Sequence, residues 1–308
     1  MSVSLNNFSV TYGKVVAIDR LTVDFREGSA GLLGVNGAGK TSLIKALLGL
    51  VPYSSGNASI LGKDITREGK TIRQLIGYMP ENDCLIPGFN GIGMVQYAGE
   101  LCGMSRIDAL QRAHEALFYV GLEEARYRNV ETYSAGMKQR IKLAQAIVHD
   151  PTLLLLDEPT IGMDPQGREE MLDLIQDISS HKNISVILSS HILLDVERTC
   201  ERVVILHQGR VAGQGTIQEL KGRHSESYTV RVEGDKEKFE AELLAQSCSV
   251  QPNGKHHLDV ILPPGCGTDL ILAAADKTEV QLRQLTAGIR SLEDVFVKLI
   301  GEEYRARL

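Results

Sequence analysis

The run Gly34-Val35-Asn36-Gly37-Ala38-Gly39-Lys40-Thr41 constrains the fold of this 308-residue chain more than any other segment. It matches the pattern GxxxxGK[ST] and lies between an expected strand at residues 31–33 and a helical pattern that ends near Gly49. Glycines at these positions let backbone N–H groups wrap a polyphosphate, and the following helix adds its positive N-terminal end. This order of strand, phosphate loop and helix predicts an α/β domain that binds a nucleotide.

Two side chains of this loop carry specific expectations. Lys40 is expected to place its charge on the β- and γ-phosphates, and Thr41 offers a hydroxyl oxygen to Mg²⁺. A glycine turn with a surface lysine is the alternative, and the agreement of motif and context disfavours it. The residues expected to line the nucleotide are Asn36, Gly37, Ala38, Gly39, Lys40, Thr41 and Ser42.

An acidic pair ends the apolar run Leu153-Leu154-Leu155-Leu156-Asp157-Glu158. A buried strand that delivers two adjacent carboxylates to its carboxyl end suits the ligand crevice of an open α/β sheet. Because successive strand side chains point to opposite faces, the two carboxylates are expected to do different work. Asp157 is predicted to hold Mg²⁺ through water, and Glu158 to orient or deprotonate an attacking water. A solvated strand end before a proline turn is the alternative, and the upstream phosphate loop disfavours it.

Two further side chains are candidates because of where they follow strands. His191 comes directly after the expected strand at 185–189, which is the next strand after the one that carries Asp157. Tyr12 lies at the end of the first strand. A tyrosine there either stacks on a base or packs the strand pair, and the spacing alone leaves both alternatives open.

Apolar patterns predict the layout of the larger part of the chain. Alternating residues near 8–12 and 21–25 predict strands that supply an antiparallel β portion. A strand-like pattern at 72–79 precedes a mainly helical stretch, residues 82–150, and strands then alternate with helices up to residue 207. This alternation predicts a mainly parallel sheet covered on both faces, with the helical stretch as an insertion.

A polar segment without periodicity, residues 222–227, marks an expected boundary between a domain of residues 1–222 and one of residues 223–308. Beyond it, alternating and helical patterns predict a small α/β domain near the lower size limit for independent folding. The run Ser291-Leu292-Glu293-Asp294 predicts the capped start of a final helix.

Charge and cysteine usage exclude several classes of protein. The net charge of −6 argues against a polyanion binder, so no nucleic acid partner is expected. The N-terminus does not read as a signal peptide, and no run approaches the ~20 apolar residues of a membrane helix. A membrane role is therefore expected only through a partner. An odd number of cysteines without a CxxC pair predicts reduced thiols in a cytosolic protein: Cys84, Cys102, Cys200, Cys248 and Cys266.

Taken in order along the chain, these motifs resemble those of the ATP-binding cassette (ABC) ATPases, over residues 2 to about 220. The resemblance makes Tyr12 the adenine-stacking residue. It assigns Walker A to 34–42, the Q-loop position to Glu81, the signature to 134–139, Walker B to 153–158, the D-loop to 161–164 and the switch histidine to His191.

The resemblance also implies roles, cofactors and an activity. It implies ATP hydrolysis with Mg²⁺, in which Lys40, Glu81, Glu158 and His191 are the catalytic residues. Thr41, Glu81 and Asp157 are the implied metal ligands. Ser134, Gly136 and Asp164 are the implied nucleotide-binding residues outside Walker A.

Several positions depart from the family pattern. Glu81 stands where most members have glutamine, and the signature reads YSAGM, with Ala135 and Met137, instead of LSGGQ. Ile161 stands where a small or polar residue is usual. None of these changes touches the phosphate loop, the acidic pair or the histidine, so an active ATPase is expected.

The resemblance extends to a class of transporter. The Glu81 and signature variations occur in ATPases that drive ABC-2-type exporters, and the tail is similar to their C-terminal extension. In this family two cassettes pair head to tail, so a homodimer or a pair with a similar subunit is implied. An integral-membrane permease is expected to dock near residues 82–103, with the protein held peripherally on the inner face of the cell membrane.

Two other functions stay open at this point: a soluble ABC ATPase that acts on ribosomes or DNA, and a nucleotide-gated regulator with weak turnover. The chain has neither the second cassette usual in translation-type members nor the long coiled-coil insert of repair-type members. Glu158 argues against the regulator, because it is expected to support hydrolysis.

Overall fold

The computed structural model describes residues 1–181, 184–222, 227–253, 257–263, 265–287 and 292–301. By its internal contacts, the described chain forms two compact units, residues 1–217 and residues 218–301. Residues 223–226 of the predicted boundary segment, and Ser291 of the predicted helix cap, lie outside the described residues.

Two sheets form the framework of the first unit. The first sheet is antiparallel, in the order β2-β1-β4-β5, and its strands are β1 (Val3–Tyr12), β2 (Val15–Phe25), β4 (Ser55–Ile60) and β5 (Lys63–Asp64). The second has the order β10-β9-β3-β8-β7-β6, and its strands are β3 (Ser29–Leu33), β6 (Ile76–Met79), β7 (Leu153–Asp157), β8 (Ser185–Ser190), β9 (Arg202–His207) and β10 (Arg210–Thr216). Its neighbouring strands are parallel except β9 and β10. The predicted fold class, a mainly parallel sheet with an antiparallel portion, is confirmed.

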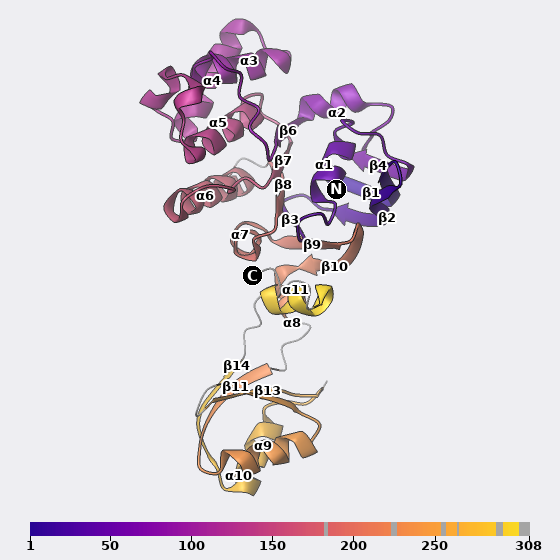
Figure 1. Cartoon of the computed structure of the whole chain (residues 1–308), viewed down its shortest axis with the longest axis vertical. Helices are drawn as coiled ribbons and strands as arrows, with labels where there is room; N and C mark the ends of the chain where they lie inside the picture. The colour runs from indigo at the N-terminus through magenta and orange to yellow at the C-terminus, as the bar shows by residue number, and fades with distance from the viewer. Residues whose placement is uncertain (182–183, 223–226, 254–256, 264, 288–291, 302–308) are drawn as a thin grey trace. The chain divides into compact units, whose positions relative to one another are not determined.

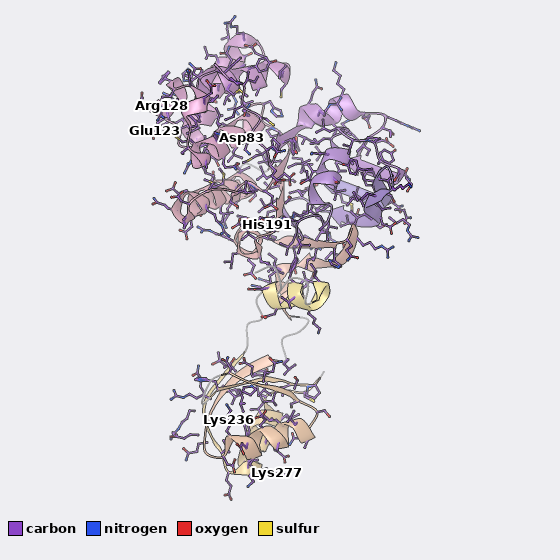
Figure 2. The ribbon with its side chains drawn as sticks, viewed as in Figure 1. Asp83, Glu123, Arg128, His191, Lys236 and Lys277 are labelled. Carbon is purple, nitrogen blue, oxygen red and sulfur yellow. The ribbon has the colours of Figure 1, made fainter. Side chains whose placement is uncertain are left out.

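The strand order of the second sheet places the predicted motifs together. Strand β8 lies between β3 and β7, so the segments that follow these three strands leave the same edge of the sheet. The phosphate loop follows β3, the acidic pair ends β7, and His191 (labelled in Figure 2) follows β8. A crevice at the carboxyl ends of parallel strands is where α/β sheets bind ligands.

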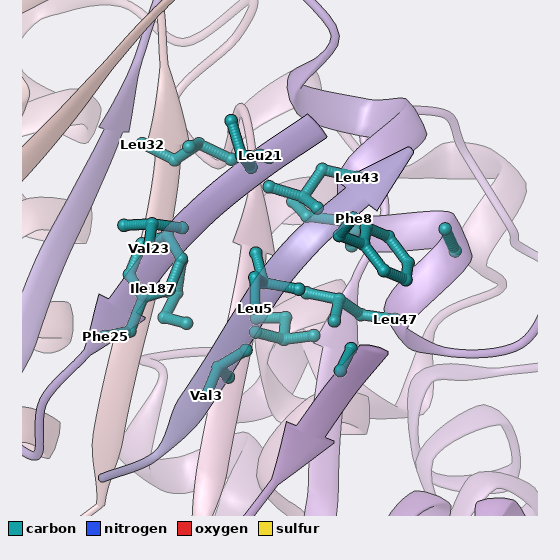
Figure 3. Packing of buried hydrophobic residues seen from close by; sticks show 14 of the residues in the cluster. Val3, Leu5, Phe8, Leu21, Val23, Phe25, Leu32, Leu43, Leu47 and Ile187 are labelled. Atoms are coloured by element: carbon teal, nitrogen blue, oxygen red, sulfur yellow. The ribbon is translucent and has the colours of Figure 1, made fainter. Parts of the chain in front are cut away.

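Helix α1 (Lys40–Leu47) joins the two sheets through one hydrophobic core (Figure 3). Leu43 and Leu47 of α1 are buried with Phe8 of the first sheet and with Leu32 and Ile187 of the second. Full burial of one such side chain stabilises a fold by ~1.5–3 kcal/mol. The helix that carries Lys40 is therefore held by core packing on both sides.

Within residues 82–150, all of them described, the chain is irregular up to an isolated bridge at Asn90 and mainly helical from residue 91 to residue 147. Three helices, α3, α4 and α5, pack on one another there and lie apart from the β1–β2 strands in Figure 1. Each begins after a residue whose side chain accepts a backbone N–H of its first turn: Asn90, Ser105 and Ser134. The segments are α3 (Gly91–Leu101), α4 (Arg106–Tyr119), the 3₁₀ turns Glu124–Tyr127 and Val130–Thr132, and α5 (Ala135–Ile147).

One predicted strand is wrong in its first half. Residues 72–75 belong to helix α2 (Gly69–Leu75), and only β6 is extended. Ile72 and Leu75 are three residues apart, which is the spacing of a helix face, and Ile72 is buried. Two further helices, α6 (Pro165–His181) and α7 (Leu193–Thr199), follow β7 and β8.

The second unit has a four-stranded antiparallel sheet with the order β12-β13-β11-β14. Its core joins Phe239 and Leu243 of α9 to Val230 and Leu258 of the sheet. The pattern at Phe239 and Leu243 predicted α9, whereas α10 went unpredicted. Helix α8 (Ile217–Gly222) begins at the last described residue of the first unit. The elements that follow are β11 (Ser227–Glu233), α9 (Lys236–Ala245), β12 (Ser249–Pro252), β13 (His257–Ile261), α10 (Asp269–Thr278), β14 (Gln281–Ala287) and α11 (Leu292–Ile300).

Candidate nucleotide-binding site

A pocket of about 440 Å³ opens beside the phosphate loop. Residues from separate parts of the first unit line it, and they include most of the predicted site. The lining residues are Tyr12, Val15, Val16, Ala17, Asn36, Gly37, Ala38, Gly39, Lys40, Thr41, Ser42, Glu81, Glu158, Ile161 and His191.

Glycine is required at two points of the phosphate loop. Gly37 and Gly39 have φ values of 84° and 106°, in the region that favours glycine. A Cβ atom on Gly39 would also lie 2.5 Å from the carbonyl oxygen of Ala17. Gly39 is the N-cap of α1 and supplies no side-chain acceptor. The first N–H groups of α1 are therefore left without a side-chain cap, as an anion-binding helix end requires.

Lys40 is buried at the floor of this loop, with 6% of its surface exposed. Its ammonium donates a hydrogen bond to the carbonyl oxygen of Gly34 at 2.7 Å. It also lies 3.3 Å from Oε1 of Glu158, whose side chain is equally buried. Lys40 and Glu158 thus form a buried ion pair beside the phosphate loop.

Glu158 is held in an unusual backbone conformation between two catalytic candidates. Its φ of 50° lies in the left-handed region, which costs a non-glycine residue about 1–3 kcal/mol. Its N–H donates to the carbonyl oxygen of Ser189 at 3.0 Å. Its Oε2 atom lies 2.8 Å from Nδ1 of His191, and its Oε1 atom faces Lys40. The carboxylate therefore bridges the lysine and the histidine.

Asp157 has a different environment, as the alternation of the strand predicts. Its side chain is completely buried and its Oδ1 atom accepts a hydrogen bond from Oγ of Ser189 at 2.5 Å. Its Oδ2 atom is buried and has no hydrogen-bond partner in the described structure. Burial and the nearby Asp157 carboxylate raise the pKa of Tyr78. An unpaired, buried carboxylate oxygen is a suitable ligand for a cation, so this donor fits Mg²⁺ or its bound water.

Tyr12, together with Val15 and Val16, forms an apolar part of the pocket wall. It is 44% exposed and lies opposite Val15 across the β1–β2 pair, and Val15 and Val16 are exposed as well. Tyr12 is thus not buried as packing for the strand pair. The geometry favours the alternative in which a flat ring stacks here. Sequence reasoning missed the two valines, although an apolar pair directly after the turn at Gly13 was a readable signal.

The predicted signature residues and Asp164 of the D-loop lie outside this pocket. Of the described residues that line the pocket, none is Ser134, Gly136 or Asp164. Ser134 is an exposed N-cap, and its Oγ accepts the N–H of Met137 at 3.3 Å. The side chain of Gln139 in α5 donates to the carbonyl oxygen of Ile161 at 2.9 Å, which ties this helix to the segment after Walker B. One chain therefore brings the phosphate loop, Tyr12, Glu81, Glu158 and His191 to one pocket. The buried Asp157 precedes Glu158 and does not itself line the pocket.

A buried polar cluster around Asp195 was not predicted. Asp195 of α7 is 1% exposed, and it accepts hydrogen bonds from Thr160 at 2.6 Å and from Nε of Arg168 at 2.7 Å. The cluster ties the segment after Glu158 to the helix after His191. Only the position of Asp195, four residues beyond His191, pointed to it.

Comparison with known proteins gives a family match for this chain and several relatives of similar length. The family described as ABC transporter matches residues 18–161. An uncharacterized ABC transporter ATP-binding protein, YxlF of Bacillus subtilis (strain 168), is 34% identical over 96% of this chain and 99% of its own length. The linearmycin resistance ATP-binding protein LnrL of the same strain is 32% identical over 97% and 98%. The bacitracin transport ATP-binding protein BcrA of Bacillus licheniformis is 33% identical over 94% of each chain.

A solved structure agrees with these relatives. The ATP-binding subunit of an ABC transporter superposes with a TM-score of 0.64 and 28% identity, over 72% of this chain and 93% of that one. In the described part of the present chain, no helix has the length and apolar character needed to cross a membrane.

Proposed function

This chain belongs to the ATP-binding proteins of ABC transporters and is an ATPase of that family, and we propose that it drives an ABC-2-type exporter as one of two cassettes. Relatives of nearly the same length are named for linearmycin resistance and bacitracin transport. Removal of an antimicrobial compound from the cell is the activity that these names support. A separate integral-membrane permease provides the path.

The proposal rests chiefly on Glu158. Its carboxylate lies 2.8 Å from Nδ1 of His191 and 3.3 Å from Nζ of Lys40, inside the pocket that the phosphate loop lines. In this role Glu158 orients the attacking water and accepts its proton, and His191 holds the carboxylate in place. Lys40 leaves Glu158 to meet the β- and γ-phosphate oxygens when ATP binds. A protein that only bound nucleotide would have no need of such a base.

The metal proposal concerns Thr41, Glu81 and Asp157. When bound, Mg²⁺ neutralises charge on the β- and γ-phosphate oxygens. Asp157 contributes the buried oxygen that has no partner, and Thr41 and Glu81 contribute oxygens from the pocket wall. Mg²⁺ commonly takes a few protein oxygens together with phosphate and water, which suits this donor set.

The second cassette completes the site. Ser134 is exposed at the N-terminus of α5, and Gly136 follows in its first turn. We assign these residues, with Asp164, to the ATP held by the other chain of a head-to-tail dimer, because a helix N-terminus stabilises phosphate. ATP binding closes the dimer, closure moves the permease docked near residues 82–103, and hydrolysis resets it.

Residues 223–308 are proposed to form a small domain that braces the dimer. Deletion of residues 224–308 is expected to leave a folded cassette whose ATP-dependent dimer dissociates more readily in size-exclusion chromatography. An insoluble truncated protein would mean instead that this part completes the core of the cassette.

Affinity purification of the tagged chain from detergent-solubilised membranes tests the transporter proposal. The expected result is co-purification with an integral-membrane protein, whose presence raises the ATPase rate. A chain recovered only with ribosomes or DNA would favour the soluble ABC ATPase instead. A chain that binds ATP but does not hydrolyse it, with or without a membrane protein, would favour the nucleotide-gated regulator.

A further inference from the structure

A buried lysine lies in the helix that begins at the signature. Lys142 of α5 has only 2% of its surface exposed. Its ammonium donates hydrogen bonds to the main-chain oxygens of Pro80 at 2.9 Å and Glu81 at 3.0 Å. Among the described residues it forms no ion pair within 4.0 Å, and burial lowers its pKa. Its hydrogen-bond partners among the described residues are thus two backbone carbonyl oxygens.

Packing alone does not explain a cation at this position. Burial of an ammonium costs several kcal/mol, whereas an apolar side chain of similar length would fill the same space without that cost. Two of the three N–H donors of Lys142 are used on consecutive carbonyl oxygens. The side chain is therefore suited to fix the path of one short backbone segment.

That segment leads directly into the nucleotide pocket. Pro80 and Glu81 follow β6, and Glu81 lines the pocket. Lys142 lies eight residues after Ser134, which is about 12 Å along an α-helix. One rigid helix thus connects the exposed signature end to the backbone of Glu81.

A second lysine on the same face of α5 contacts the same segment. Lys138 is one turn before Lys142, and its Nζ lies 2.9 Å from Oδ2 of Asp83 (labelled in Figure 2). This ion pair is partly exposed, and such pairs contribute little stability. The buried contact of Lys142 is the one expected to set the position of Glu81.

We propose that Lys142 is a positioning residue that couples Glu81 to the signature helix. When a second chain draws the N-terminus of α5 onto its nucleotide, the ammonium carries the backbone of Glu81 with the helix and brings its carboxylate to the metal position. This inference rests on the proposed two-cassette function. It adds a specific mechanical link between the two halves of the site.

Hydrogen exchange of the nucleotide-free, full-length chain tests the link without catalysis. In Lys142→Met, the amides of residues 81–84 are expected to exchange about tenfold faster or more, while those of β7 and β8 keep their protection. Lys142→Arg keeps the charge and the donors and is expected to restore part of the protection. Lys70→Met, which removes an exposed lysine from α2, is the matched control and is expected to change nothing.

Kinetics test the consequence. Lys142→Met is expected to lower kcat about tenfold with KM for ATP within about threefold, because the phosphate loop still binds the nucleotide. It is also expected to raise the Mg²⁺ concentration needed for half-maximal rate. In a Glu81→Ala background, Lys142→Met should have no further effect on that Mg²⁺ requirement, because the carboxylate that it positions is gone.

Three results would overturn the link: wild-type exchange at 81–84 in Lys142→Met, faster exchange throughout the first unit, or an undiminished Mg²⁺ effect in the Glu81→Ala background. If the wild-type chain hydrolyses no ATP, the proposed function fails. The exchange measurement on the nucleotide-free protein still decides whether Lys142 holds Glu81.

Discussion

The two helix N-termini that we propose bind phosphate begin in different ways. Helix α1 begins after Gly39, which has no side chain, and Lys40 at its first position is 6% exposed. Helix α5 begins after Ser134, an exposed residue whose hydroxyl caps its own helix. The first N-terminus lies in a pocket that one chain completes, and the second does not line that pocket. We call the pocket at the start of α1 the phosphate-loop half of the site and the exposed start of α5 the signature half. This difference is what we expect of a site that two chains share.

The variant with the largest expected effect changes Glu158, in the phosphate-loop half of the site. Glu158→Gln keeps the shape of the side chain and removes its ability to accept a proton. We expect the ATPase rate to fall about a thousandfold, because a positioned base contributes about 10²–10⁴. ATP binding should persist, and the closed dimer should accumulate in size-exclusion chromatography with ATP. Full turnover by a monomeric variant would contradict both the role of Glu158 and the shared site.

Lys40→Ala tests whether the phosphate-loop half of the site binds ATP by itself. Loss of this buried charge is expected to weaken ATP binding about a hundredfold by calorimetry. Unchanged binding would overturn the assignment of the pocket.

The control for Lys40→Ala is a variant of the signature half, Ser134→Glu. Ser134→Glu should bind ATP normally and fail to form the closed dimer, because a carboxylate there repels phosphate. An equal mixture of the two variants should recover ATPase activity, since one site of each mixed dimer has an intact Lys40 and an intact Ser134. A mixture that stays inactive would mean that the halves do not come from different chains.

Gly136→Ala separates an effect on the stability of the fold from an effect on the ATPase rate. A Cβ atom on Gly136 meets only Met163 Cε, at 3.6 Å, which is an ordinary contact. The fold should therefore be as stable as before or slightly more so, since alanine favours a helix by up to about 1 kcal/mol over glycine. The ATPase rate should still fall about tenfold, because the added methyl group meets the phosphate of the other chain. A variant with wild-type activity would remove Gly136 from the site.

The smallest effect concerns the far end of α5. His149 is half-buried, its Nε2 lies 3.1 Å from the carbonyl oxygen of Ile76, and burial lowers its pKa. The unfolded chain therefore takes up a proton on this histidine at a higher pH than the folded chain, so stability falls as the pH drops below the ordinary histidine value. The melting temperature should fall by a few degrees between about pH 7.5 and about pH 5.5, and by less in His149→Gln. An equal fall in both proteins would exclude His149 as the cause.

The sequence predicted the motifs that have local signals better than the buried polar residues of the helices. The phosphate loop, the Walker B strand and the insertion of helices were readable because glycine spacing, apolar runs and helical periodicity are local signals. The strand expected at 72–79 was half wrong, because Ile72 and Leu75 are three residues apart, a helical spacing that the strand prediction overlooked. Lys142 and Asp195 were not predicted, because a lysine in a helix and an aspartate in a short helix look like surface residues until the fold buries them.

The chemical groups can be read from the residues alone: a glycine loop with Lys40, an acidic pair, a histidine after the next strand, and a capped helix at Ser134. Which of these groups meet depends on the fold. Placing β8 between β3 and β7 brings Glu158 to His191 and Lys40. Within this arrangement Oδ2 of Asp157 is buried without a partner in the described structure. Packing of α5 against β6 gives Lys142 the backbone of Glu81 as its partner. Strand order depends on long-range packing, which local residue patterns do not encode.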